Sequence, residues 1–402
     1  MLSRRRFIIN TGLIVGTTLL RPRIPLVWGQ DDSANARDGA WNDRMVPVHE
    51  PVGWQEDAYY CWGGDAIIGP GEEGPQTVHF YGTRWPKWSG FLGWLWRSEI
   101  CRATSDSPTG PFTTREVILT QRTAPRNDGT SYWDHHSVFN STTLEYNGQV
   151  YIFYTGTQHD PAKSYGPRDL PQQTMRVTQI RDSHERMAQR IGVLIGDSPI
   201  GPWRRLDEPL FAPDPDAPVF HSNPSAVIVP DGRCFLYYKT VDLTHGNLVF
   251  ALATAPAPEG PYTQHPANPI IAPGRGLNIE DMCVWVEDGR FFMLFKDMSG
   301  RLCGVPNGTA MIDSPDGVNW NLDHAKLAFT PGWRTADGFR EVHRLERANL
   351  LMRNGKPAVL YCAALNGDER LDPTHPLHRR LTEEQIRSLP PLASRNIAIA
   401  LR

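Results

Sequence analysis

A unit of two apolar strands joined by a tight turn recurs five times along the 402-residue chain. Its clearest copy spans 278–298, where apolar runs at 282–286 and 290–295 flank Asp288 and Gly289. Two apolar runs separated by such a dipeptide predict a β-hairpin, because both turn residues adopt positive φ easily. The other copies lie at 63–85, 138–157, 222–240 and 345–364. Such a recurrence is typical of an all-β repeat protein.

A third strand that ends in a Gly-Pro-aromatic corner follows several of these hairpins. The corners lie at 99–112, 190–203 and 248–262, and a weaker fourth lies at 308–320. Gly-Pro supplies a turn, and the aromatic residue after it can pack against a neighbouring sheet. Antiparallel units of three or four strands that cannot bury their faces alone are typical of a β-propeller. The five hairpins therefore predict a five-bladed β-propeller with long loops on one face, of which 158–189 is the longest.

The first 29 residues are set apart from the fold. The run SRRRFI at 3–8 precedes an apolar stretch that ends at Leu20, and this order resembles a twin-arginine export signal. We expect residues 1–29 to direct export to the periplasm or beyond, and residues 30–402 to form one catalytic propeller domain. The alternative is an uncleaved membrane anchor, although the apolar run is short for a span. With the signal removed, we expect no stable membrane association.

Composition and the motifs that the sequence lacks reduce the number of functions to consider. The net charge of −3 does not favour nucleic-acid binding or attachment to a membrane surface. Six widely spaced cysteines without a CxxC pair predict buried free thiols. We find no GxGxxG after a strand, no P-loop and no Ser-His-Asp signature, so we expect no organic cofactor. One short helix is predicted at 382–388 and a last strand at 396–401, which completes blade five or pairs with the start of the chain.

Polar residues stand near the start of each predicted inner strand. The inner strands of a propeller surround its axis, so these side chains should share one funnel. The set is Asp65, Asn140, Asn223, Glu280 and Glu346 with Arg347. Glycoside hydrolysis needs a protonated carboxyl that assists the leaving oxygen and an ionised carboxylate that activates water or attacks carbon. Crowding and burial push the pKa values of neighbouring carboxyls apart, which makes both roles possible near neutral pH.

The hairpins, the corners SDSPTGPF and GDSPIGPW and the strand IEDM resemble those of the five-bladed propeller glycoside hydrolases, the superfamily of arabinanases, β-xylosidases, invertases and levansucrases. The resemblance covers residues 59–364 and is closest to glycoside hydrolase family 43 and its unassigned relatives. In that family an Asp of blade one is the general base and a Glu of blade four is the general acid. The resemblance therefore implies that Asp65 is the base and Glu280 the acid.

One family position is not matched. A middle Asp of the family orients the acid and tunes its pKa, but blade three carries Asn223 there. Asp134 in the run WDHHS, or Asp281 beside the acid, can replace it. Each catalytic assignment also has a structural alternative: Asp65 can cap a turn, Glu280 can form an ion pair with a lysine or arginine, and Asp134 can belong to a hydrogen-bonded knot.

Further residues near the predicted funnel are candidates for substrate binding. Asn140 and Asn223 can donate and accept hydrogen bonds with sugar hydroxyls. Lys239 either pairs with a funnel carboxylate or binds an acidic sugar. His136 and His221 have no accompanying acidic ligands, so we predict hydroxyl contacts and no metal site. The candidates together are Trp62, Arg84, Trp133, His136, Asn140, His221, Asn223, Lys239, Asp281, Lys296 and Arg347.

The sequence thus predicts an exported glycoside hydrolase that binds a plant- or algal-type oligosaccharide or glycoside. Glu280 would protonate the leaving oxygen, and Asp65 would activate water. Two alternatives stay open. A phosphorylase or transglycosylase of the same fold would use a basic phosphate pocket, which the lysines and arginine near the acid can supply. A propeller that binds carbohydrate without cutting it is favoured by Asn223, which cannot ionise.

Overall fold

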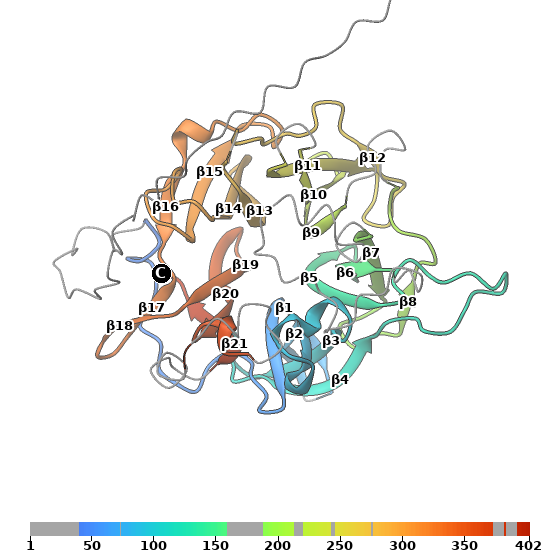
Figure 1. The fold of residues 1–402 in the computed structure, drawn as a ribbon, viewed down its shortest axis with the longest axis horizontal. Coiled ribbons are helices and arrows are strands. Elements are labelled where there is room, and N and C mark those ends of the chain that lie inside the picture. The colour runs from blue at the N-terminus through green and yellow to red at the C-terminus, as the bar shows by residue number, and fades with distance from the viewer. Residues whose placement is uncertain are drawn as a thin grey trace, which may run out of the picture. The chain divides into compact units, whose positions relative to one another are not determined.

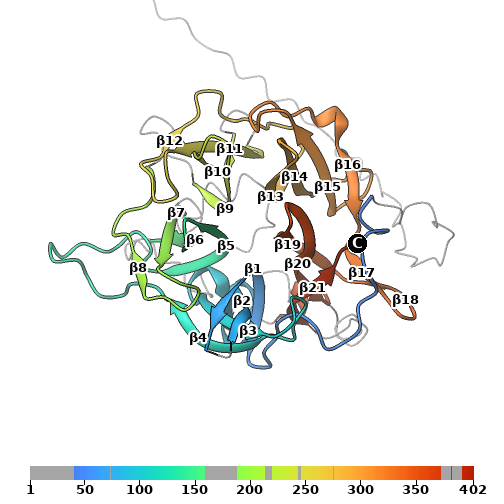
Figure 2. The same cartoon turned by 180° about the vertical axis from the view of Figure 1, so that it is seen from behind.

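The five predicted hairpins form the inner strands of five antiparallel sheets. In the computed structural model these sheets lie around a common axis, with β1, β5, β9, β13 and β19 nearest to it (Figures 1 and 2). The structure describes residues 40–72, 74–158, 188–212, 220–242, 246–274, 276–372, 382 and 392–402. The fold is therefore the all-β, five-bladed propeller that the sequence predicts.

Four of the blades contain four strands, paired in chain order. Blade 1 consists of β1 (Tyr59–Gly71), β2 (Gly74–Pro86), β3 (Glu99–Ser105) and β4 (Thr113–Leu119). Blade 2 consists of β5 (Ser137–Tyr146), β6 (Gln149–Thr157), β7 (Arg190–Gly196) and β8 (Trp203–Arg205). Blade 3 consists of β9 (Ser222–Ile228), β10 (Cys234–Val241), β11 (Leu248–Ala255) and β12 (Thr263–Gln264). Blade 4 consists of β13 (Ile279–Glu287), β14 (Arg290–Asp297), β15 (Gly308–Ser314) and β16 (Lys326–Phe329).

Blade 5 joins the two ends of the propeller. It consists of β19 (Arg344–Arg353), β20 (Lys356–Asn366) and β21 (Ala393–Ala400), and the hairpin of β17 (Gly332–Thr335) and β18 (Gly338–Glu341) precedes it. Antiparallel bridges link Met45 to Leu401 and Trp54 to Asn396, so the lead-in segment runs beside β21. The predicted last strand therefore both completes blade five and pairs with the start of the described chain.

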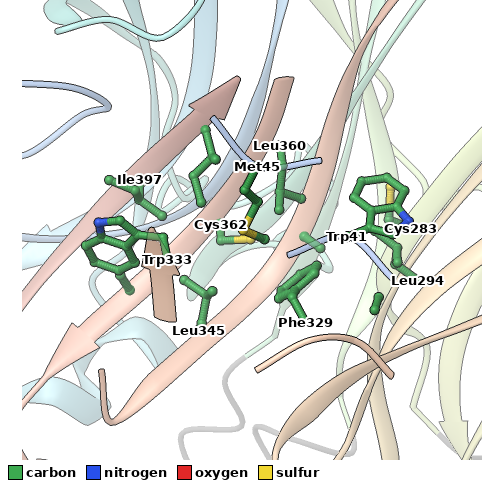
Figure 3. Packing of buried hydrophobic residues seen from close by; sticks show 14 of the residues in the cluster. Trp41, Met45, Cys283, Leu294, Phe329, Trp333, Leu345, Leu360, Cys362 and Ile397 are labelled. Atoms are coloured by element: carbon green, nitrogen blue, oxygen red, sulfur yellow. The ribbon is translucent and has the colours of Figure 1, made fainter. Parts of the chain in front are cut away.

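Apolar layers between adjacent blades make up the core. Figure 3 shows the layer between blades 4 and 5, where Cys283 and Leu294 of blade 4 face Leu345 and Leu360 of blade 5. Trp41 of the lead-in segment packs into the same layer, edge-on to Trp285. Corresponding layers lie between the other neighbouring blades. Each sheet buries both faces against its neighbours, which no single blade can do alone.

Three of the four dipeptide turns predicted for the hairpins have the expected backbone, whereas at Asp231 and Gly232 only the glycine has positive φ. Both turn residues have positive φ at Asn147 and Gly148, at Asp288 and Gly289, and at Asn354 and Gly355. This is the geometry of a type I′ turn, which matches the twist of a two-residue hairpin. The three Gly-Pro corners also share one feature, a cis peptide bond before the proline.

The inner strands share an irregularity close to the axis. Each blade has a break in strand register near the start of its first strand. One residue at each break has positive φ, between 52° and 58°: Gly63, Asn140, Asn223, Asp281 and Arg347. We call these five residues the axial ring. The break takes one residue of each blade out of the regular alternation of the strand, as β-bulges do, and in blades 2 to 5 this residue has a polar side chain.

Some predictions fall outside the described residues. These are the export signal at 1–29, most of the helix at 382–388 and most of the insert at 158–189. The short 3-10 helices that are described are η2 (Lys87–Ser89), η3 (Phe91–Leu95), η5 (Leu322–His324) and η6 (Glu369–Leu371). Within the described ranges, no helix has the length and apolar character needed to cross a membrane.

Candidate active site

The axial ring is held by hydrogen bonds between blades. The backbone N–H of Asn140 donates to Thr83 Oγ1 at 3.0 Å, and that of Asn223 donates to Thr155 Oγ1 at 3.0 Å. Each threonine lies on the second strand of the preceding blade, so the same contact recurs one blade later. The side chains then continue around the ring: Asn140 Nδ2 donates to Asn223 Oδ1, and Asn223 Nδ2 donates to Asp281 Oδ1, both at 2.8 Å.

Arg347 closes the ring on the side where blade 1 contributes no side chain. Its Nη1 lies 3.3 Å from Asp281 Oδ1, and its Nη2 donates to the carbonyl oxygen of Asn140 at 3.3 Å. In blade 1 the residue of the axial ring is Gly63. A Cβ built there would lie 3.5 Å from three atoms of the Arg347 side chain. The arginine therefore runs past the space that a fifth side chain would enter.

A pocket lies beside this ring. Its aromatic lining comes mainly from blade 1 and the loop after β2, and its polar lining comes from the other blades and connecting loops. The lining residues are Trp62, Thr83, Trp85, Phe91, Leu92, Trp94, Phe139, Asn140, Gln189, Phe220, Asn223, Lys239, Glu280, Asp281, Arg344, Glu346, Arg347 and Glu369. A concave site with an aromatic wall and convergent polar groups is the usual form of a small-molecule site.

Four carboxylates reach the pocket, and each has a cationic partner. Glu280 Oε1 lies 2.8 Å from Lys239 Nζ, and Asp281 pairs with Arg347. Glu346 pairs with Lys296 and, at 3.4 Å, with Arg344. Glu369 is bound by Arg344 and by His343, whose Nε2 lies at 3.2 Å. Glu280 has the most accessible side chain of the four, with 21% exposed against 6–16% for the others.

Burial and neighbouring charges move the pKa values of two of these carboxyls, Asp281 and Glu346, in opposite directions. Burial raises the pKa of Asp281, and the charges of Glu280 and Glu346 add to this effect against that of Arg347. Burial acts on Glu346 in the same sense, but the cations Lys296 and Arg344 outweigh it and lower its pKa. Neighbouring carboxyls with divergent pKa values are what acid/base chemistry requires.

Glu369 is also held in its ionised form. Its pKa falls to about 2 because its hydrogen bond with His343 and the charge of Arg344 outweigh the effect of burial. The same residue belongs to a group with His343 and Asp368 whose potential ligand atoms lie within 4.8 Å of one another. Since Arg344 already binds Glu369 and Arg370 binds Asp368, the structure gives no reason to assign a metal ion there.

Eight of the residues predicted from the sequence line this one pocket. The structure brings together Trp62, Asn140, Asn223, Lys239, Glu280, Asp281, Glu346 and Arg347. The pairing of Glu280 with Lys239 matches the ion pair that was the structural alternative for this residue.

Asp65 lies elsewhere, between blades 1 and 2. Its Oδ2 accepts a hydrogen bond from the backbone N–H of Thr143 at 2.7 Å, and the residue is 5% exposed. Ser225, at the equivalent position of blade 3, accepts from the backbone N–H of Val284 at 2.9 Å. Asp65 thus makes an inter-blade contact of a kind that the propeller repeats. It does not line the pocket, and this position gives no support to the role of general base.

Asp134 is also not part of the pocket lining. It is fully buried, with Arg122 Nε at 2.7 Å, Arg205 Nη2 at 2.6 Å and the Tyr154 hydroxyl at 2.8 Å. These contacts form the hydrogen-bonded knot that was the structural alternative. Trp133 stacks on Tyr154 at 5.5 Å between ring centroids, so its indole packs within blade 2 and does not line the pocket.

The other four candidates do not line the pocket. His221 is buried between Phe211 and Tyr238, and burial lowers its pKa to about 3. Arg84 forms ion pairs with Glu99 of β3 and with Glu56, which precedes β1. Lys296 does not line the pocket but pairs with Glu346, which does. His136 donates its backbone N–H to Thr157 and is not among the lining residues.

Sequence reasoning missed four polar residues of the pocket, which are Thr83, Gln189, Arg344 and Glu369. Arg344 lies two residues before Glu346 on β19, so strand alternation places both side chains on one face and was a usable signal. Glu369 lies on the turn η6 after β20, and Gln189 directly precedes β7. No strand pattern marks either of these two residues, because their positions depend on the paths of connecting segments.

Several solved structures have a fold similar to that of this chain. No protein-family model and no curated protein matches the sequence. A family 117 glycoside hydrolase of the marine bacterium Zobellia galactanivorans is 17% identical, with 89% of each chain covered and a TM-score of 0.56. A protein solved as an RGII complex is 12% identical, with 90% of this chain and 92% of the other covered and a TM-score of 0.56.

A thermostable family-43 glycoside hydrolase is similar to the same extent. It is 12% identical, with 88% of this chain and 91% of the other covered and a TM-score of 0.52. At these identities the likeness concerns the fold. The chain therefore has the five-bladed β-propeller fold found in glycoside hydrolases of families 117 and 43.

Proposed function

We propose that the protein is a glycoside hydrolase whose active site is the pocket beside the axial ring. The observation that carries this proposal is that Glu280 and Glu346, two carboxylates from adjacent blades, line one pocket together with aromatic residues that include Trp62 and Trp94. Aromatic rings suit the CH faces of sugars, and paired carboxyls suit cleavage of a glycosidic bond. The glycoside hydrolases that share this fold support the same conclusion.

In this proposal Glu280 donates a proton to the leaving oxygen. It is the most exposed of the pocket carboxylates and therefore the best placed to meet a substrate. Glu346, which its cationic neighbours keep ionised, accepts the proton of the attacking water. The bond from the anomeric carbon to the leaving oxygen breaks as the bond to water forms, and each carboxyl returns to its starting state after proton exchange with solvent.

We propose a plant- or algal-type oligosaccharide as the substrate. Two proteins of this fold support this proposal: one is a family 117 enzyme of a marine bacterium, and another was solved as an RGII complex. The polar wall of asparagine, glutamine and charged side chains fits a hydroxyl-rich ligand.

We also propose that the protein is exported through residues 1–29. The run SRRRFI followed by an apolar stretch supports this, since it matches the order of a twin-arginine signal. Replacing Arg4 and Arg5 together by lysine should retain the protein in the cytoplasm, as measured by cell fractionation. Unchanged recovery in the exported fraction would contradict the proposed route.

A second function has its own supporting observation. All four pocket carboxylates have cationic partners, and the axial ring carries Gly63 on blade 1 and Asn223 on blade 3 instead of carboxylates. A site of this kind can bind a carbohydrate without cutting it.

Activity on a panel of aryl glycosides and plant and algal oligosaccharides, beside binding to the same compounds, separates the two functions. Release of sugar by the wild type and its loss in Glu280→Gln supports the hydrolase. Saturable binding without release, equal in wild type and variant, supports the binding propeller.

A further inference from the structure

The axial ring has one position without a side chain. The five equivalent residues share the same positive φ, and four of them carry polar side chains, but blade 1 contributes Gly63. The three atoms nearest to a Cβ at this position belong to Arg347, all at 3.5 Å. This is an ordinary contact distance, so a space large enough for at least one carbon atom lies against the arginine.

Arg347 has unused donor capacity toward this space. Its side chain is 4% exposed, and its contacts with Asp281 and with the carbonyl of Asn140 are both long at 3.3 Å. Its Nε has no hydrogen-bond partner among the described residues, and Nε is one of the atoms that face the Gly63 position. A buried guanidinium N–H without an acceptor is costly, and native proteins rarely leave one.

We propose that Gly63 and Arg347 form an oxyanion subsite in the floor of the pocket. The oxyanion is a carboxylate on the bound sugar, as in a uronic acid, or an inorganic phosphate. The oxygen accepts the Arg347 Nε hydrogen bond from the space that a fifth ring side chain would fill. This inference deepens the proposed function, on which it rests for the identity of the site.

Charge favours an oxyanion over a neutral hydroxyl at this place. The guanidinium donors lie in a fixed plane that suits the paired oxygens of carboxylate and phosphate. Two further cations, Lys239 and Arg344, line the same pocket. Burial also raises the pKa of Asp281, the one acidic partner of Arg347 among the described residues, which weakens the competition for the arginine. A hydrogen bond to a charged group is worth about 1.5–3 kcal/mol, or roughly 10- to 100-fold in affinity.

The test replaces Gly63 by two residues that are isosteric with each other, asparagine and aspartate. Asparagine already occupies the same φ at two other ring positions, so Gly63→Asn fits the backbone. Gly63→Asp has the same shape but supplies an oxyanion to Arg347 from within the protein. Both variants should lose oxyanion binding, and Gly63→Asp should have the higher melting temperature of the two. If the space beside Arg347 did not favour a negative charge, the two variants would have equal melting temperatures.

Binding is measured by calorimetry with glucuronic and galacturonic acids, with glucose and galactose, and with inorganic phosphate. Tighter binding of a uronic acid than of its neutral sugar, by about tenfold or more, assigns the subsite to the substrate. Binding of phosphate at this affinity, abolished in Gly63→Asn, assigns it to a phosphate. Equal binding of acidic and neutral sugars together with no phosphate binding overturns the proposal.

Gly355→Asn is the matched control. Gly355 has φ +74 in the hairpin between β19 and β20, with no atom within 4 Å of a Cβ, and the replacement should leave every affinity unchanged. The binding result is independent of turnover. If sugars bind as proposed but no glycoside is cut, the hydrolase proposal fails and the subsite stands. If neutral glycosides are cut, acidic ones are not preferred and phosphate does not bind, the subsite fails and the hydrolase stands.

Discussion

Replacing Asp65 by asparagine should remove a loss of stability that the wild type suffers as the pH rises. The carboxyl is buried between blades 1 and 2, where Oδ2 accepts from Thr143 but Oδ1 has no partner among the described residues. Burial raises its pKa from 3.8 to about 6, against the hydrogen bonds from Thr143 and Thr142. The folded protein therefore binds this proton more tightly than the unfolded chain does.

The size of the effect follows from that difference. A carboxyl whose folded pKa lies above its unfolded value contributes stability that is fully present below about pH 4 and is lost as the pH rises through about 6. A change from 3.8 to about 6 corresponds to about 3 kcal/mol in the free energy of unfolding. Asparagine has the shape of the protonated acid and does not titrate. Asp65→Asn should thus equal the wild type near pH 4 and exceed its stability by about 3 kcal/mol at pH 8.

Urea unfolding of the mature protein, followed by tryptophan fluorescence between pH 4 and 8, measures this difference. All other titrating groups are common to both proteins, so they cancel. A difference in unfolding free energy that does not change with pH would refute the reasoning about burial. A variant that is stable but has lost activity by orders of magnitude would refute the structural role and return Asp65 to the position of general base.

Three further predictions concern the contacts that hold the blades. Ser225→Ala should lower the free energy of unfolding by about 1–2 kcal/mol with no dependence on pH, because the buried N–H of Val284 loses a neutral acceptor; a pH-dependent loss would contradict this. Asp134→Asn should cost about 3–5 kcal/mol by leaving two arginines without their buried partner, while KM of the folded fraction stays unchanged; an altered KM would place Asp134 in the site. Deleting 393–402 should prevent folding, since β21 joins blade 5 to the lead-in segment; a cooperative thermal transition in the truncated protein would contradict that closure.

The strands and hairpins could be predicted because their signals are local. Alternating apolar residues and dipeptides such as Asn147 with Gly148 act over a few residues, and the structure shows type I′ turns at these places. The register near the axis could not be predicted in this way. Asp65 and Gly63 lie two residues apart on one strand, and the break in register between Trp62 and Gly64 makes Gly63 the ring residue. The alternation of apolar and polar residues along a strand does not show where such a break in register occurs.

Several residues of the candidate site could be predicted because they lie directly on an inner strand. Glu280 and Asp281 follow from the IEDM strand, and Arg347 follows from its equivalent on blade 5. Asp134 and His221 precede inner strands by only a few residues, yet both side chains are buried in the protein and neither lines the pocket. The sequence shows that these residues are near a strand end, but the partners that bury them come from distant segments.

The central claim is that the pocket beside the axial ring is a glycosidase active site, and Glu280→Gln tests it most directly. The measurement is kcat/KM on the best substrate of the panel, beside the melting temperature of each protein. The account predicts a fall of about 10²- to 10⁴-fold, because proton transfer to the leaving group is lost, with the melting temperature nearly unchanged. Undiminished turnover, or a variant that unfolds because Lys239 has lost its partner, would contradict it.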